Sequence, residues 1–262
     1  MVGKICGTGS YVPPRVMDNN DLSKIVDTND EWIRERTGIG KRHIIDEETT
    51  SYMAGQAALR AIEQSGIDPE EIDMILVGTS SSETVFPCAA CEVQRMIGAK
   101  RAVGYDLNAA CTGFVLGFNT AQAYISSGFC RTVMVIGADS MSNMVDWKDR
   151  STCILFGDGA GAVILRAEEG APVYMAAHSD GVKGPALTGL SRHRKDWEKE
   201  LEPGAVKESY IHMDGQGVFK FAVRKVPEII EEVLEEAGNS LDDIDYFVLH
   251  QANRRIIEAV AK

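Results

Sequence analysis

The sequence predicts an α/β protein whose strands pair mainly in parallel. Apolar strands alternate with helices along the chain, which is the pattern of βαβ units. A helix–glycine–strand unit also occurs twice. The 262 residues, 44% of them hydrophobic and 25% charged, suffice for one large or two ordinary domains. This apolar content excludes a disordered chain, and the lack of a sustained heptad pattern excludes a coiled coil.

Each element follows from local pattern. Short apolar runs bounded by polar or glycine residues indicate strands, expected at Gly3–Thr8, Met74–Gly78, Ala102–Asp106, Thr132–Gly137, Ala160–Arg166, Val173–His178 and Tyr246–Leu249. Longer segments, several of them ended by glycine, indicate helices, expected at Asp21–Ile25, Asp30–Thr37, Thr50–Ser65, Cys88–Ile97, Thr112–Ser127, Val218–Ala237 and Arg254–Lys262. A polar loop is expected over Asp180–Tyr210, with the charged stretch Ser191–Glu200 as a solvated loop or flap.

The repeat relates Ala61–Val77 to Val233–Leu249 at a constant offset of 172 residues. The identical pairs are Glu63/Glu235, Gly66/Gly238, Ile72/Ile244 and Asp73/Asp245. Any helix–glycine–strand unit gives some likeness, but the ungapped register favours duplication. We therefore expect two halves, residues 1–170 and 171–262. Two full units would need 344 residues, and 344 − 262 = 82. The second unit could simply be shorter, but the sequence stops within the expected helix Arg254–Lys262, whereas the first unit continues long past the matching point, so the second half is expected to be truncated at its C-terminus.

Charge and cysteine content narrow the functional class. The net charge of 27 − 39 = −12 argues against broad nucleic-acid binding. The sequence has no apolar run long enough to span a membrane and no signal peptide, so we expect a cytoplasmic protein without a membrane partner. The six cysteines are then expected to be free thiols. For the Cys88–Cys91 pair we favour helix packing over redox chemistry or a metal site, because two further metal ligands at matching spacing are lacking.

Two positions stand out as candidate catalytic residues. Cys111 lies where a strand gives way to an apolar helix, so the positive end of the helix dipole should favour its thiolate. It should therefore react with an alkylating agent ahead of Cys88 or Cys91. His250 follows an apolar strand at a strand–helix junction, where side chains face a ligand crevice. A small buried residue at a helix cap and a structural histidine are the alternatives.

Five segments together resemble the 3-oxoacyl-[acyl-carrier-protein] synthase III family: Gly7–Pro13, Asp30–Ile39, Asn108–Phe114, Phe156–Ala162 and His250–Asn253. The glycine-rich Phe156–Ala162 leads into a strand and lacks G-x-G-x-x-G spacing, so it is not a dinucleotide loop. The resemblance implies a thiolase-like fold, with two repeated βαβαβ halves in a five-layer αβαβα arrangement whose second half is incomplete here. It also implies a condensing acyltransferase that starts fatty-acid synthesis.

The resemblance further implies roles for individual residues. Cys111 would carry the acyl group and His250 would bind the enolate formed from malonyl-acyl carrier protein. The coenzyme A and acyl sites would use Trp32, Arg36, Arg150, Phe86, Phe219 and Asn253. Contacts with the acidic carrier protein would come from Lys220, Arg224, Arg254 and Arg255. No cofactor or metal is implied, since the coenzyme A thioester is a substrate, and the enzyme is expected to be a homodimer.

One departure from the family weakens the assignment of full activity. The family has an asparagine in a Gly-Asn-Thr-Ser segment after the histidine, and a glycine-rich strand beyond it. Neither is found here, because Gly238-Asn239-Ser240 precedes the histidine. Condensation is accordingly expected to be at least about 10²-fold slower than in a full-length version, whereas acylation is expected to be less affected. The alternatives are a related condensing enzyme with another acyl substrate, and a non-catalytic acyl-CoA-binding fragment.

Overall fold

The structure, a computed structural model, describes residues 1–189 and 210–262. The chain forms two compact units, each built from three separate segments. Unit 1 comprises Met1–Met17, Arg42–Ser142 and Gly157–Met175, and unit 2 comprises Asp18–Lys41, Asn143–Phe156 and Ala176–Lys262. Residues 18–41 and 143–156, which lie in the first half expected from the repeat, therefore group with unit 2.

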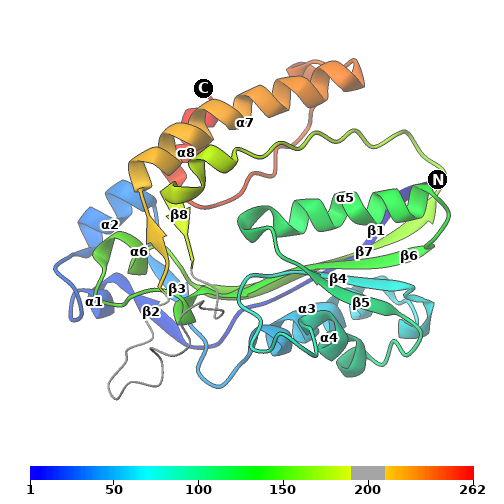
Figure 1. The fold of residues 1–262 in the computed structure, drawn as a ribbon, viewed down its shortest axis with the longest axis horizontal. Helices are drawn as coiled ribbons and strands as arrows, with labels where there is room; N and C mark the ends of the chain where they lie inside the picture. The colour runs from blue at the N-terminus through cyan, green and yellow to red at the C-terminus, as the bar shows by residue number, and fades with distance from the viewer. Residues whose placement is uncertain (190–209) are drawn as a thin grey trace. The chain divides into compact units, whose positions relative to one another are not determined.

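Unit 1 is a five-stranded sheet covered by helices on both faces (Figure 1). Its strands, in spatial order, are β1 (Val2–Tyr11), β7 (Asp158–Glu168), β6 (Thr132–Ser140), β4 (Met74–Gly78) and β5 (Val103–Leu107). Only β7 runs against its neighbours, whereas β6, β4 and β5 pair in parallel. The α/β class and the predominance of parallel pairing are confirmed.

The sheet positions its helices through alternating side chains along β4 and β6. Ile75 and Val77 pack with α3 (Thr50–Ser65) and α4 (Ala89–Ile97) in one apolar cluster. Met74 and Leu76 point the other way and pack with Ala121 and Ile125 of α5 (Gly113–Ser126) in a second cluster. Because successive side chains of a strand face opposite sides, one five-residue strand serves both cores.

Two glycines set the start of α5. A Cβ atom added to Gly78, at the end of β4, would lie 2.6 Å from the carbonyl carbon of Gly113, the first residue of α5. The opposing atom is backbone, so a larger residue at position 78 would push the helix away. This contact holds the beginning of α5 directly against the end of β4.

The remaining elements of unit 1 are short. They are η1 (Pro69–Glu71), η2 (Ala110–Thr112), η3 (Met141–Asn143), and the paired strands β2 (Val16–Asp18) and β3 (Lys41–His43). The terminal residues Asp18, Lys41 and Asn143 of these elements already belong to unit 2.

Unit 2 is mostly helical in its described part. Its elements are α1 (Asn19–Leu22), α2 (Asp30–Thr37), α6 (Arg150–Cys153), η4 (Gly181–Ala186), β8 (Leu187–Thr188), β9 (His212–Met213), α7 (Gly215–Ala237), η6 (Leu241–Asp243) and α8 (Arg254–Val260). The strands β8 and β9 pair antiparallel. The expected polar loop Asp180–Tyr210 thus contains η4 and β8, while its stretch Ser191–Glu200 lies outside the described residues.

The sequence repeat is matched in local structure. Gly66 ends α3 with φ +69°, and Gly238 ends α7 with φ +67°. A three-residue 3₁₀ helix follows each glycine at the same offset of 172, at Pro69–Glu71 and Leu241–Asp243. Each 3₁₀ helix begins with a capping box, Asp68 with Glu71 and Ser240 with Asp243. Both copies therefore end their helix and turn in the same way.

Two expected strands do not form in the described structure. Residues 173–178 and 246–249 have no regular secondary structure, and no described strand pairs with either segment. Tyr246 is 87% exposed and Val248 is 92% exposed. Apolar β-branched sequence alone does not make a strand, because the ladder needs a partner that accepts and donates its hydrogen bonds.

Among the described residues, no helix is both long and apolar enough to cross a membrane.

Candidate functional site

Cys111 lies in the short turn that connects β5 to α5 in unit 1. It is the middle residue of η2, the 3₁₀ helix that directly precedes α5. Ala110, the residue before it, has φ +45°. An alanine in this left-handed region stores about 1–3 kcal/mol of backbone strain. The strained residue, Ala110, directly precedes Cys111 and so affects the orientation of its side chain.

A partly buried carboxyl group, that of Asp139, lies near this turn, at the end of β6. Asp139 Oδ1 accepts hydrogen bonds from Thr79 Oγ1 at 3.2 Å, Ser80 N at 2.8 Å and Ser81 Oγ at 2.9 Å. Ser80 Oγ in turn donates to Asn108 Oδ1 at 3.3 Å. The polar network therefore extends from Asp139 to the Asn108–Cys111 turn.

The pKa of Cys111 is raised, whereas the sequence predicted a site that favours its thiolate. Desolvation by the surrounding atoms raises the pKa of the Cys111 thiol, and the charge of Asp139 raises it further, although the side chain keeps contact with solvent. Burial also raises the pKa of Asp139, even though its hydrogen bonds oppose the shift. The expected thiolate-favouring effect of the helix start is thus outweighed, because a carboxylate and a desolvated site both disfavour a second negative charge.

His250 lies in unit 2, shortly before α8. Desolvation lowers the pKa of His250 below its ordinary value, while the side chain keeps some contact with solvent. A lowered histidine pKa keeps the imidazole neutral at pH 7, in the form that has one donor and one acceptor nitrogen.

Three residues assigned to coenzyme A by resemblance are brought together in unit 2. The guanidinium carbon of Arg36 lies 4.4 Å from the centroid of the Trp32 ring, and that of Arg150 lies 4.7 Å from it. Arg150 also donates a hydrogen bond to the carbonyl of Asp27 at 2.7 Å. A separation of 4.7 Å leaves no room for a base between Arg150 and the indole. Arg150 would therefore have to move away from Trp32 for adenine to stack between the two side chains.

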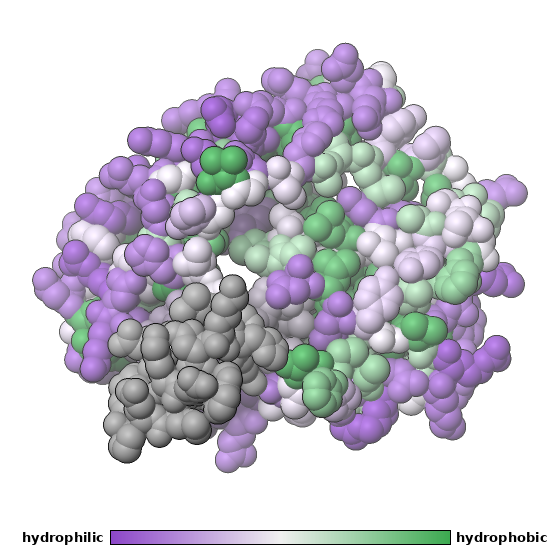
Figure 2. Space-filling view, in the orientation of Figure 1, coloured by the Kyte–Doolittle hydropathy of each residue, from purple (hydrophilic) through white to green (hydrophobic). Residues whose placement is uncertain are grey.

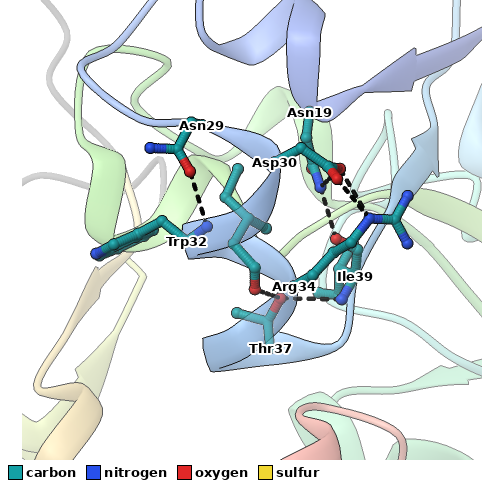
Figure 3. A network of polar contacts seen from close by, with 8 residues as sticks. Asn19, Asn29, Asp30, Trp32, Arg34, Thr37 and Ile39 are labelled. Atoms are coloured by element: carbon teal, nitrogen blue, oxygen red, sulfur yellow. Dashed lines mark hydrogen bonds and ion pairs between the residues drawn. The ribbon is translucent and has the colours of Figure 1, made fainter.

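The helix that carries Trp32 is held by polar contacts at both ends (Figure 3). Asn29 caps α2 by accepting a hydrogen bond from Trp32 N at 2.8 Å. Asn19 Nδ2 donates to Asp30 Oδ1 and to the carbonyl of Ile39, each at 2.8 Å, and so joins the start of α2 to the second residue after its end. The indole points away from this network, so Trp32 is fixed at its backbone while its ring contacts Arg36 and Arg150.

The three other expected substrate-site residues have different surroundings. Phe86 in unit 1 is 86% exposed, so it does not line a closed pocket of its own unit. In unit 2, the Phe219 ring lies 5.7 Å from the guanidinium carbon of Arg255. Asn253 caps α8 by accepting a hydrogen bond from Arg255 N at 2.8 Å, so its amide oxygen is committed to the helix.

The four basic residues expected to contact the carrier protein lie on α7 and α8 of unit 2. Arg224 pairs with Glu228 at 3.9 Å, and Arg254 pairs with Glu258 at 2.7 Å. Lys220 and Arg255 are exposed, and neither forms an ion pair with any residue that the structure describes. Counting only described residues as partners, these two are the least neutralised cations of the set.

Sequence reasoning missed Asp139, and it attached no role to Ala110 and Asn108 within the Cys111 motif. Asp139 carried one usable signal: it is an acidic residue at the end of an apolar strand, where side chains of α/β sheets reach a ligand crevice. The strain at Ala110 has no such signal, because alanine is rarely chosen for positive φ.

Within the described ranges, no group of three or more His, Cys, Asp or Glu side chains is arranged to hold a metal ion.

Comparison with known proteins places these features in a family. Residues 105–181 match the family described as 3-oxoacyl-[acyl-carrier-protein] synthase III, and residues 234–262 match the C-terminal region of the same family. The chain is 49% identical to the beta-ketoacyl-[acyl-carrier-protein] synthase III of Clostridium acetobutylicum over 264 residues. That alignment covers 99% of this chain and 79% of the relative.

Solved structures give the same result. The 3-oxoacyl-[acyl-carrier-protein] synthase III of Aquifex aeolicus matches with a TM-score of 0.85 and 44% identity, covering 99% of this chain and 80% of that one. The priming β-ketosynthase of the R1128 polyketide pathway matches with a TM-score of 0.92 and 35% identity, over 99% and 77% of the two chains. The thiolase-like fold is thereby confirmed, and the chain belongs to the 3-oxoacyl-[acyl-carrier-protein] synthase III family.

Proposed function

We propose that this protein is the acyltransferase that starts bacterial-type fatty-acid synthesis, and that Cys111 is its nucleophile. The observation that carries the proposal is the Asn108–Cys111 turn at the start of α5, in a chain of this family. In the first stage the Cys111 sulfur attacks the carbonyl carbon of acetyl-CoA, forms an acyl-cysteine thioester and releases coenzyme A. Backbone N–H groups at the start of α5 are suited to the thioester oxygen.

The second stage joins the acyl group to malonyl-acyl carrier protein. The malonyl group loses CO₂, the resulting enolate carbon attacks the acyl-cysteine carbonyl, and Cys111 leaves as a thiolate. His250, neutral at pH 7, is suited to donate a hydrogen bond to the enolate oxygen. No cofactor takes part in this scheme, in which coenzyme A enters as a thioester substrate. The two sequence halves, residues 1–170 and 171–262, would supply the cysteine and the histidine respectively.

We assign the coenzyme A nucleotide to Trp32, Arg36 and Arg150. An indole with two guanidinium groups at 4.4 and 4.7 Å presents both an aromatic surface and positive charge, which suit adenine and phosphate. Phe86 would wall the acyl pocket, and Phe219 with Asn253 would line the pantetheine channel. Asn253 would have to do so through its amide nitrogen, because its oxygen caps α8.

A second copy of the chain is the protein partner we propose, in addition to the carrier protein. The strand β5 forms one edge of the unit 1 sheet, and β4 is its only partner among the described residues. Val103 in this strand is 55% exposed, and Phe114 and Val115 are exposed on α5, where hydrophobic side chains gather in Figure 2. An unpaired apolar edge is a template for strand pairing with another chain.

A cytoplasmic location completes the proposal, since six free thiols suit a reducing compartment.

Incubation with acetyl-CoA labelled in the acetyl group tests the nucleophile. We expect one label per chain on Cys111, released by neutral hydroxylamine, and none in Cys111→Ala. His250→Ala should keep this acylation but lose malonyl decarboxylation by about 10²–10⁴-fold, because it removes a positioned donor. Tight coenzyme A binding without any label would favour a binding fragment, and labelling only by longer or branched acyl-CoA would favour a related condensing enzyme.

Asp139→Asn tests the electrostatics at Cys111. Removing the carboxylate charge should lower the pKa of the thiol and therefore increase the thiolate fraction at neutral pH. We expect alkylation of Cys111 by iodoacetamide at pH 7 to become about three- to tenfold faster, with the midpoint of its pH profile moved to lower pH. Alkylation of Cys91 in the same sample is the internal control. An unchanged profile at Cys111 would mean that desolvation alone sets its pKa.

Trp32→Ala tests the coenzyme A site by calorimetry. Loss of one base–aromatic stack, worth about 1–3 kcal/mol, should raise the Kd for coenzyme A by about 5- to 150-fold. Trp32→Phe keeps an aromatic face and should lose much less. Acetyl-pantetheine lacks the adenine, so its reaction with Cys111 should be unaffected by either variant. Equal losses with acetyl-pantetheine and acetyl-CoA would show that Trp32 supports the fold and does not bind the nucleotide.

Reversal of two cations tests the carrier-protein surface. The chain has a net charge of −12, so an acidic carrier protein needs a local basic patch to dock. Lys220 lies on α7, whose surface is mostly hydrophilic in Figure 2, and Arg255 lies on α8. The double variant Lys220→Glu/Arg255→Glu should weaken binding of malonyl-carrier protein by at least about tenfold at low salt and leave coenzyme A binding intact.

The matched control for that experiment changes the net charge equally at two exposed lysines of unit 1, in Lys4→Glu/Lys100→Glu. It should bind the carrier protein like the parent chain. If both double variants weaken binding to the same extent, overall charge and not a patch on α7 and α8 governs docking.

A further inference from the structure

Gly38 ends α2 in unit 2 and lies directly against the first residue of α8. Its φ is +79°, and its N–H donates a hydrogen bond to the carbonyl of Arg34 at 2.9 Å. A Cβ atom added to Gly38 would lie 2.9 Å from the Cβ of Arg254, the residue that begins α8. The Cβ of Arg254 is fixed to the helix backbone, so it cannot swing aside as the end of a long side chain can. A larger residue at position 38 would therefore force α2 and α8 apart.

The end of α2 is held in place by polar contacts, several of which are drawn in Figure 3. Thr37 Oγ1 donates a hydrogen bond to the carbonyl of Ile33 at 2.7 Å and accepts one from Ile39 N at 3.0 Å. Asn19 Nδ2 donates to the carbonyl of Ile39 at 2.8 Å. Thr37 and Asn19 are both buried, so moving this turn would leave buried polar groups unpaired. A collision at Gly38 should therefore be relieved by movement of α8.

The segment that carries His250 leads directly into α8. Residues 246–249 form no ladder with a described strand, and the side chains of Tyr246 and Val248 are almost fully exposed. Asn253, three residues after His250, caps α8. The helix α8 packs against α2 and α7, and the close contact with α2 is made at its first residue. The start of α8 is thus the nearest fixed point for His250 along the chain.

We propose that Gly38 is a positioning residue for His250. Because it has no side chain, the end of α2 can meet Arg254 directly, and this contact fixes the start of α8 and with it the imidazole. The inference rests on the function proposed above, in which His250 donates a hydrogen bond to the enolate oxygen. The same contact keeps the helix of Trp32 and Arg36 at a constant spacing from His250, so the coenzyme A helix serves both stages of the reaction.

The experiment measures release of CO₂ from saturating malonyl-pantetheine, which lacks both the nucleotide and the carrier protein. Gly38→Ala should lower kcat by about 10- to 100-fold, because a displacement of about 1 Å can cost a positioned group that much. Acylation of Cys111 by saturating acetyl-pantetheine, measured in the same preparation, should be unchanged, because it does not use His250. An equal loss in both reactions would overturn the proposal.

Gly238→Ala is the matched control for backbone strain. Gly238 also ends a helix of unit 2 with positive φ, at +67°, but no described atom lies within 4 Å of an added Cβ. The alanine therefore meets the same unfavourable φ without a collision. Gly238→Ala should release CO₂ at the parent rate, and a loss as large as that of Gly38→Ala would contradict the proposal.

A double-mutant cycle with His250→Ala shows whether Gly38 acts through the imidazole. In the His250→Ala background, Gly38→Ala should cause no further loss of decarboxylation, because the group that it positions is already absent. The same fold-loss in both backgrounds would refute a positioning role while leaving the proposed function intact. Decarboxylation that is unaffected by His250→Ala alone would instead refute the proposed role of His250, and the positioning role with it.

The exchange variant Gly38→Ala/Arg254→Gly moves the Cβ from one side of the contact to the other. Removing the collision should make decarboxylation at least about tenfold faster than in Gly38→Ala. If Gly38→Ala alone does not fold, the exchange variant should restore both folding and decarboxylation. Failure to recover in either case would show that the contact between Gly38 and Arg254 does not position His250.

Discussion

The close approach of Gly78 to Gly113 is the constraint on which the candidate site depends. Because neither residue has a side chain, the backbone at the end of β4 meets the first turn of α5 directly. The turn that precedes α5 therefore has little space, and Ala110 takes up the strain with its positive φ. Cys111 is held by this arrangement at the edge of the sheet, within the polar network that runs from Asp139 through Ser80 to Asn108.

The position that orients the thiol also makes its ionisation harder. The start of α5 provides backbone N–H groups and a favourable dipole, but desolvation and the carboxylate of Asp139 raise the pKa of Cys111. A thiol of raised pKa is a stronger nucleophile once it ionises, although fewer molecules carry the thiolate at a given pH. It is also protected from unwanted oxidation and alkylation while no substrate is bound. The proposed nucleophile, Cys111, is thus positioned by backbone geometry and is not activated by its electrostatic surroundings.

Local sequence patterns were sufficient for most of unit 1. The apolar run Met74–Gly78 predicted β4, and the glycine at position 66 predicted the end of α3, because each depends on a few neighbouring residues. Residues 173–178 and 246–249 have equally apolar sequences, but strand formation also needs a partner, which a local pattern does not contain. The grouping of residues 18–41 and 143–156 with unit 2 likewise depends on long-range contacts.

The candidate site was predictable in its residue types and not in its electrostatics. Cys111 and His250 stood out from their positions at strand–helix junctions. Trp32 and Arg150 were linked only through the family resemblance, since 118 residues separate them and no local pattern joins them. The effect of Asp139 on Cys111 arises from burial and from charge proximity across the sheet, and neither quantity can be read from spacing along the chain.

The duplicated junctions after α3 and α7 bear on the order in which the chain folds. Each closes through a left-handed glycine, a 3₁₀ turn and a capping box whose partners lie three residues apart in sequence. Contacts of such low sequence separation cost little loop-closure entropy, so they form on the microsecond scale of local helix and turn formation, about 0.1–10 μs. The β1–β7 ladder, by contrast, joins residues more than 140 positions apart. The chain therefore forms these two matching turns before the β1–β7 ladder can assemble.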